Sequence, residues 1–277
     1  MPWIITFAVF WLYPLIYAAY LSFTDYKTLT DELAFIGFDN YSRIFTDPVF
    51  WTALKNTAVF TFGTVPFTTA FALFFAVLLN DKLIKFREFF RASYFMPSIT
   101  SLVVISLIFT NLYAQNGYIN ELLKMVGAAY PEKGWLNTPE TALFSIMAMD
   151  VWMATGYYMV LFLAGMQTIP DDLYESATLA GASGWQKFWK ITLPLVKPTL
   201  LFVLVINTIK SFQVFIEIFV MTKGGPMNAT TTLVYLIYEN AFENPDMMGY
   251  AAAMAFILFF LLMIMSFIQM KVLKTDY

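Results

Sequence analysis

Long apolar stretches, separated by short polar segments, make up most of the chain. A membrane-spanning helix needs about 20 consecutive residues that are mostly apolar. Six segments meet this requirement: Trp3–Phe23, Thr57–Leu79, Ala92–Tyr113, Ala142–Ile169, Leu193–Thr222 and Met247–Met270. None of them alternates apolar and polar residues with a period of two, which disfavours a transmembrane β-barrel. The pattern predicts an all-α membrane protein with six transmembrane helices, organised as a single domain over residues 1–277.

The composition supports this fold class and removes several kinds of chemistry. Hydrophobic residues make up 60% of the chain and charged residues 13%, against about 45–50% and about 25% in soluble domains. Cysteine and histidine are both absent, which excludes disulfides, thiolate nucleophiles, Ser-His-Asp triads and HExxH zinc sites. With a net charge of −3, the chain offers no basic surface for nucleic acid. We expect a non-catalytic protein without a metal site.

Charged residues between the spans predict the orientation in the membrane. The segments after the second, fourth and sixth spans carry nine Lys and Arg residues, whereas the segments on the other side carry six. Cytoplasmic loops carry the excess of Lys and Arg, so we expect both termini in the cytoplasm. The chain enters its first span at Trp3 without a basic flank. We therefore expect the native N-terminus to be longer.

The loop at residues 170–194, on the predicted cytoplasmic side, has the pattern of two short helices. Two aspartates follow Pro170, and acidic residues are typical of the first turn of a helix, where free N–H groups attract them. The glycine-containing segment Gly181–Gly184 should end this helix. A second short helix over Trp185–Ile191 should follow, and Pro194 should open the fifth span.

This loop resembles the coupling loop of ABC importer permeases, which are membrane subunits driven by a separate ATPase. The residues that match the family signature are Glu175, Ala177, Gly181, Ile191, Leu193 and Pro194. The chain has Ser176 where the family usually has alanine, and Ala180 where it often has aspartate. Both departures leave the helix and its glycine break intact. The resemblance implies that the loop docks in a cleft of the ATPase, where Glu175 meets a basic residue.

Other segments resemble the maltose-type branch of this family, whose members import sugars. They are Tyr13–Tyr17, Phe38–Tyr41, Gly134–Leu136, Leu163–Pro170, Met221–Pro226, Ala241–Phe242 and Gly249–Ala253. The resemblance implies one of two permease subunits of an oligosaccharide importer in a bacterial or archaeal cytoplasmic membrane. It also implies a sister permease, two copies of an ATPase that binds ATP–Mg, an extracytoplasmic solute-binding protein and surrounding lipid. No cofactor is expected on this chain.

Three ionisable residues, Asp150, Lys210 and Glu217, lie well inside the predicted spans. A charge at a helix centre costs about 2.5–3.5 kcal/mol on insertion scales, so each should face a cavity or a partner. Helical spacing adds neighbours on the same faces, namely Met153, Ala154 and Tyr157 beside Asp150, and Asn207, Ser211 and Val214 beside Lys210 and Glu217. The resemblance implies that these two helices line the sugar site. With Gln213, these residues would offer a sugar donors, acceptors and aromatic faces.

Several alternatives remain open at this point. Asp150 and Lys210 can neutralise each other, or Lys210 can pair with Glu217. The substrate can be a neutral saccharide, an acidic saccharide or another polar solute.

Two other classes of membrane protein are less favoured. A secondary transporter usually has inverted repeats and more than six spans, and no repeat is evident in this sequence. The lack of His and Cys disfavours an intramembrane enzyme. The three acidic residues of the loop disfavour a helix that rests on anionic lipid. No G-x-x-x-x-G-K-[ST] motif is present, so ATP binding by that motif must lie in a partner.

Overall fold

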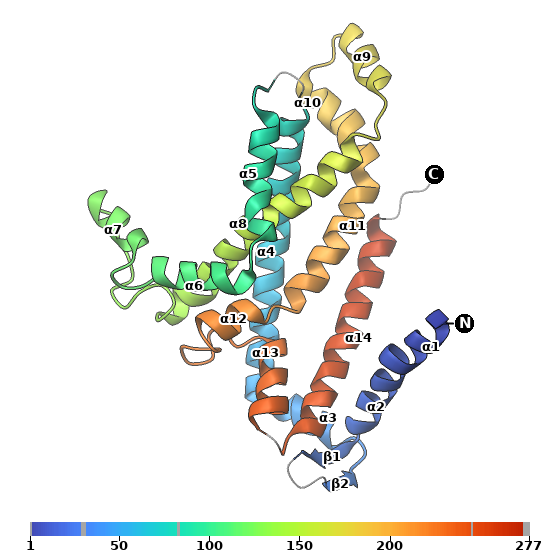
Figure 1. The fold of residues 1–277 in the computed structure, drawn as a ribbon, viewed down its shortest axis with the longest axis vertical. Helices are drawn as coiled ribbons and strands as arrows, with labels where there is room; N and C mark the ends of the chain where they lie inside the picture. Colours follow the sequence, from blue (N-terminus) through green and yellow to red (C-terminus); the bar gives the residue numbers. More distant parts are fainter. Residues whose placement is uncertain (1, 29–31, 82–83, 245, 274–277) are drawn as a thin grey trace.

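The computed structural model describes residues 2–28, 32–81, 84–244 and 246–273, and it consists mainly of long, tilted helices (Figure 1). The elements in chain order are α1 (Pro2–Phe7), the π-helical segment η1 (Ala8–Leu12), α2 (Tyr13–Leu21), β1 (Thr24–Lys27), β2 (Glu32–Phe35), α3 (Asp39–Thr46), α4 (Pro48–Asn80), α5 (Arg87–Ile99), α6 (Leu102–Leu112), α7 (Tyr118–Met125), α8 (Pro139–Met166), α9 (Asp171–Leu179), α10 (Gly184–Lys187), the π-helical segment η2 (Phe188–Thr192), α11 (Leu193–Phe212), α12 (Ile216–Met221), α13 (Leu233–Tyr238), the π-helical segment η3 (Glu239–Glu243) and α14 (Met248–Leu273). The strands β1 and β2 form an antiparallel hairpin. The predicted helical fold class is confirmed.

Six apolar stretches of the described chain are long enough to cross a membrane, if the bent pair α5 and α6 counts as one. The helices α4 and α14 both run from the end that carries the hairpin and α3 towards the end that carries α9 and α10 (Figure 1). The segment after α4, the 170–194 loop and the end of α14 therefore lie on one side, as the charge pattern predicts. That this side is cytoplasmic stays a prediction.

The third predicted span, Ala92–Tyr113, is not one straight helix. The helices α5 and α6 meet at 94°, because the backbones of Thr100 and Ser101 between them leave the helical conformation, with ψ of 149° and 124°. Pro97 has no N–H to continue the last turn of α5. The Thr100 hydroxyl donates to the Met96 carbonyl at 3.0 Å and so satisfies part of that turn. The bend turns α6 sideways towards α12 (Figure 1).

The fifth predicted span begins earlier than the sequence indicates. The helix α10 passes through η2 into α11 without a break. Pro194 lies in the first turn of α11, as predicted, although the helical stretch already begins at Gly184. The second short helix predicted at Trp185–Ile191 is likewise the beginning of this stretch. The segment η2 is a single π-helical turn between α10 and α11, and helices accommodate such a turn as a local irregularity.

The same span is interrupted near its other end. The helix α11 stops at Phe212, and α12 begins at Ile216 in a different direction (Figure 1). Backbone groups that an interruption frees inside a membrane must find other partners. The Thr232 hydroxyl donates to the carbonyl of Val214 at 3.1 Å. The predicted span over Leu193–Thr222 is present as part of the apolar stretch Gly184–Met221, but its helix is interrupted between Phe212 and Ile216, where a side chain from a later segment satisfies the freed carbonyl.

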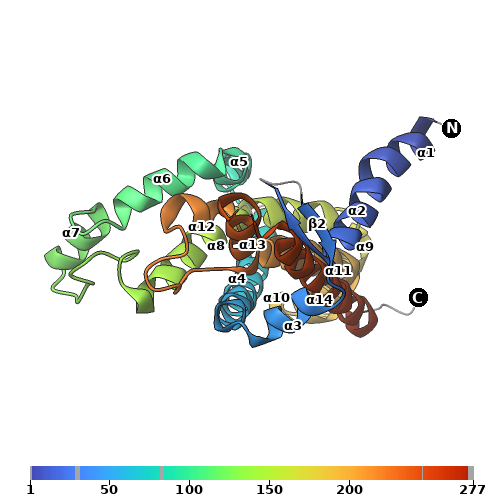
Figure 2. The ribbon, with the colours of Figure 1, turned by 90° about the horizontal axis from the view of Figure 1, so that it is seen from below.

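The helices α4, α8, α11 and α14 form the centre of the molecule, while α6 and α7 project from one side and α1 from the other (Figure 2). The face of α4 that points inwards carries threonines at helical spacing. Thr57, Thr61, Thr64 and Thr68 are at most 1% exposed. Small polar residues let membrane helices approach closely and hydrogen-bond across the interface. The centre of the bundle is therefore both tightly packed and polar.

Candidate functional site

The helix α9 of the loop ends at a glycine in the left-handed conformation. Gly181 has a φ of +75°. Its N–H donates to the carbonyl of Thr178 at 3.0 Å, and the N–H of Ala182 donates to the carbonyl of Ala177 at 2.9 Å. These two bonds define a Schellman end of a helix, which favours glycine at the left-handed position. The structure therefore contains the predicted glycine break, and Ala177 takes part in it through its carbonyl.

The second part of the loop is held by side chains that the sequence analysis did not identify. Ser183 accepts a hydrogen bond from the N–H of Gln186 at 3.3 Å, and the Gln186 side chain accepts from the N–H of Ser183 at 2.8 Å. This capping box follows the S/T-x-x-Q pattern, so a sequence signal did exist. The hydroxyls of Tyr174 and Thr192 lie 2.9 Å apart and connect α9 to η2. No local pattern indicates that second contact.

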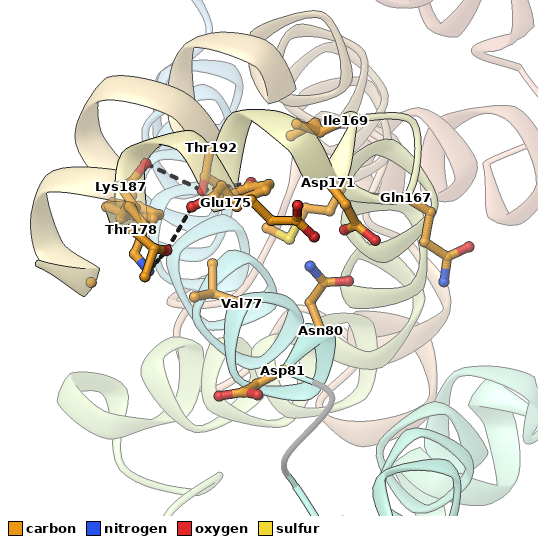
Figure 3. Close-up of a pocket in the computed structure, with 14 residues that line it drawn as sticks. Val77, Asn80, Asp81, Gln167, Ile169, Asp171, Glu175, Thr178, Lys187 and Thr192 are labelled. Atoms are coloured by element: carbon orange, nitrogen blue, oxygen red, sulfur yellow. Dashed lines mark hydrogen bonds between the residues drawn. The ribbon is translucent and has the colours of Figure 1, made fainter. Parts of the chain in front are cut away.

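Glu175 lines a cavity of about 930 Å³ between the loop and the ends of α4 and α8. Figure 3 shows Asp171 and Glu175 on the side of the loop, and Asn80 and Asp81 at the end of α4 on the opposite side. Three of these four side chains are acidic, and Lys187 is the basic residue among those that line the cavity. The underside of the loop therefore carries an excess of negative charge.

The outer surface of the loop exposes large apolar side chains. Leu179 is 91% exposed and Trp185 is 70% exposed. In contrast, Ile191 packs against the core cluster that joins α4, α8 and α11. Leu193 is half-buried and Pro194 is exposed. Ile191 therefore attaches the loop to the bundle, whereas Leu179 and Trp185 remain accessible to a partner.

A second candidate site lies in the middle of the bundle, where an ion pair joins α8 to α11. The Nζ atom of Lys210 is 2.9 Å from Oδ1 of Asp150, and the side chain of Asp150 is only 3% exposed. Lys210 also interacts electrostatically with Glu217. Of the two pairings that the sequence left open, the structure shows the one between Asp150 and Lys210.

A cavity of about 240 Å³ lies beside this ion pair. It is lined by Ser98, Met153, Ala154, Tyr157, Tyr158, Ile206 and Lys210. Met153, Ala154, Tyr157 and Lys210 belong to the predicted substrate path, so the structure brings these four together. Ser98 was not identified, because it lies on α5 and no pattern along the sequence links it to α8.

The other predicted substrate-path residues lie elsewhere. Ser211 accepts a hydrogen bond from Thr64 of α4 at 3.3 Å. Asn207 is also fully buried, and neither atom of its amide has a hydrogen-bond partner among the described residues. Gln213 is exposed at the end of α11, and Glu217 is buried on α12. The single helix face predicted to carry Asn207 and Glu217 was therefore wrong, because the helix is interrupted between them.

The family follows from a comparison over almost the whole chain. A family model described as "Binding-protein-dependent transport system inner membrane component" matches residues 1–274. The chain belongs to this family. The permease therefore has the architecture that the loop resemblance implied, and its six apolar stretches agree with a protein of the inner membrane.

Two relatives match the permease at about one third identity. The lactose transport system permease protein LacF of Rhizobium radiobacter is 34% identical over 270 residues, which is 97% of this chain and 90% of LacF. The arabinooligosaccharides transport system permease protein AraP of Bacillus subtilis is 35% identical over 273 residues, which is 98% of this chain and 85% of AraP. Both relatives are transport permeases, which agrees with a non-catalytic role.

A solved structure shares the fold of the permease. It belongs to a bacterial ABC transporter involved in the import of the acidic polysaccharide alginate, and its chain superposes with a TM-score of 0.86. The two chains are 24% identical, and the match covers 99% of the permease and 93% of that chain. At this identity the likeness concerns the fold alone.

Proposed function

We propose that this permease is one of two membrane subunits of an ATP-driven sugar importer, and that its substrate is an oligosaccharide. The observation that carries the proposal is the exposed loop with Glu175, which connects directly to α8 and α11. The same two helices hold the ion pair of Asp150 and Lys210. A movement of the loop can thus reach the middle of the bundle through stretches of helix. Relatives that are named as permeases for lactose and arabinooligosaccharides support the sugar class.

The loop is the docking surface for a separate ATPase on the cytoplasmic side. Aromatic and apolar side chains are enriched in the cores of protein interfaces, and Leu179 and Trp185 are exposed on the loop. Glu175 adds a negative charge that selects a basic residue on the partner. Two copies of the ATPase bind and hydrolyse ATP–Mg. A sister permease completes the pore, and an extracytoplasmic binding protein delivers the sugar, in line with the family description.

The ion pair favours a substrate without net charge. Lys210 already neutralises Asp150 at 2.9 Å, so it is not free as a counter-charge for an acidic sugar. A neutral sugar requires hydrogen bonds and an apolar surface. The cavity beside the pair offers both, through Tyr157 and Tyr158.

Purification from the native membrane tests the function directly. The tagged permease should bring with it a second permease and an ABC ATPase, and ATP hydrolysis by the complex should rise when sugar-loaded binding protein is added. The chain has no phosphate-loop motif of its own, so all hydrolysis should disappear when the ATPase subunit is removed. Recovery of the permease alone, with uptake driven by an ion gradient, would contradict the proposal in favour of a secondary transporter.

The orientation can be tested with single cysteines, since the chain has none. Cysteines at Lys85 and Ser183 should resist an impermeant thiol reagent in intact cells, whereas those at Asp39, Glu132 and Asn228 should react. All five positions are exposed. A third predicted cytoplasmic position, Lys274, lies outside the described residues. The opposite labelling pattern would overturn both the orientation and the cytoplasmic role of the loop.

A further inference from the structure

Ser98, in the last turn of α5, inserts its hydroxyl into one turn of α8. The hydroxyl donates to the carbonyl of Met153 at 2.6 Å and accepts from the N–H of Tyr157 at 3.0 Å. In a regular α-helix, the N–H of each residue donates to the carbonyl four residues earlier. The two backbone groups that Ser98 contacts are thus each other's regular partners. A side chain inserted at such a place is one of the few known causes of a helix kink.

The backbones of α5 and α8 are in contact at this same turn. A Cβ atom on Gly156 would overlap the carbonyl oxygen of Tyr94 and would lie 2.9 Å from Cα of Phe95. Only glycine allows this approach, and without it the Ser98 hydroxyl could not reach α8. The bend between α5 and α6 follows directly after Ile99. Two features therefore fix the position of Ser98: the close approach of α5 to Gly156 before it, and the bend between α5 and α6 after it.

Residues of this turn also line the cavity beside the ion pair of Asp150 and Lys210. Ser98, Met153 and Tyr157 all line the cavity of about 240 Å³. Asp150, which pairs with Lys210 of α11, lies one turn earlier on α8. Towards its other end, α8 leads to α9 of the coupling loop, residues 170–194. A change of bend at Met153–Tyr157 therefore alters the cavity and the position of the loop together.

We propose that Ser98 is a positioning residue for transport. Its hydroxyl competes for the backbone groups of Met153 and Tyr157 and thereby favours a bent form of α8 at this turn. During the transport cycle the hydroxyl leaves, the regular backbone hydrogen bond closes, and the coupling loop moves relative to the outer half of α8. Packed helices switch between discrete arrangements rather than deforming continuously. From the measured strength of side-chain hydrogen bonds within membranes, two such bonds change the equilibrium between the two forms about tenfold.

Substitution of Ser98 by alanine tests this role in the assembled transporter. Ser98→Ala removes both hydrogen bonds. It therefore favours the form of α8 in which the N–H of Tyr157 bonds the carbonyl of Met153, and the bent form should be populated less often. We expect the maximum rate of uptake into liposomes to fall about tenfold, with the KM for sugar changed by less than about twofold. Ser98→Thr keeps a hydroxyl and should restore the rate. Ser93→Ala is the matched control, because the Ser93 hydroxyl donates to Phe89 within its own helix.

A distance measurement separates positioning from folding. Spin labels at cysteines that replace Phe144 and Ala164 lie on exposed positions on either side of the turn. The distance between them reports the bend of α8. Ser98→Ala should shift the distances to longer values, and Ser93→Ala should leave them unchanged.

Two outcomes would overturn the proposal. One is a Ser98→Ala transporter with normal rate and unchanged distances. The other is a lower amount of transporter in the membrane while each assembled complex keeps its normal rate and distances. If the alanine variant does not assemble, Ser98→Cys provides a weaker hydrogen-bonding group, and a normal rate in that variant would equally refute the role of the hydroxyl.

Discussion

Replacement of Gly181 by isoleucine is expected to reduce sugar uptake at least about tenfold, while the permease stays in the membrane. The residue has a φ of +75°, a conformation that costs an L-amino acid about 1–2 kcal/mol, and β-branched residues the most. A Cβ atom at this position would meet no other atom within 4 Å. The effect should therefore come from the backbone alone, through loss of the turn that orients α9 against α10. Uptake and ATPase binding are measured in liposomes.

Gly184 provides a matched control for this experiment. It has the same open surroundings and is not among the glycines with positive φ. Gly184→Ile should therefore retain most of the uptake, and Gly181→Asn should too, since asparagine tolerates the left-handed conformation. Full uptake and normal ATPase binding with isoleucine at residue 181 would show that the turn is not needed for coupling.

Replacement of Lys210 by methionine should lower the amount of folded permease strongly, whichever sugar is supplied. The change leaves the carboxylate of Asp150, which is 3% exposed, without its partner at 2.9 Å. Removal of one member of a buried ion pair costs about 3–5 kcal/mol, because an uncompensated charge stays buried; since the Lys210 side chain is 38% exposed, this is the upper end of the expected loss. Glu217, a second buried acidic side chain, loses Lys210 as a basic neighbour in the same variant. Thermal unfolding of the purified complex measures it.

The double variant Asp150→Asn with Lys210→Met is the informative comparison. It removes both charges, so stability should largely return, together with uptake of neutral sugars. If Lys210→Met instead assembles normally and raises the KM of acidic sugars much more than that of neutral ones, Lys210 binds the charge of the substrate. Unchanged stability and uptake would exclude both roles for the pair.

Much of the loop could be predicted from the sequence, because its signals are local. The acidic first turn of α9 and the break at Gly181 depend on a few neighbouring residues, and both are present. Pro194 lies in the first turn of α11, as predicted, but the helical stretch itself begins earlier, at Gly184. A proline usually marks a helix start, but here it follows the π-helical turn η2 within a continuous stretch. The substrate path was predicted only in part, because helix spacing along one chain does not show which neighbour each face meets.

The sequence by itself determined the number and order of the spans and the charged residues inside them, since lipid requires long apolar stretches and makes exceptions costly. Only the tertiary structure decided where those spans bend and which residues meet. The contact of Ser98 with Met153 joins helices 55 residues apart in the chain, and Thr232 satisfies the carbonyl of Val214 across 18 residues. A backbone group freed inside a membrane can be satisfied by any donor that packing brings near. Such partners are fixed by the arrangement of the helices, which no local pattern encodes.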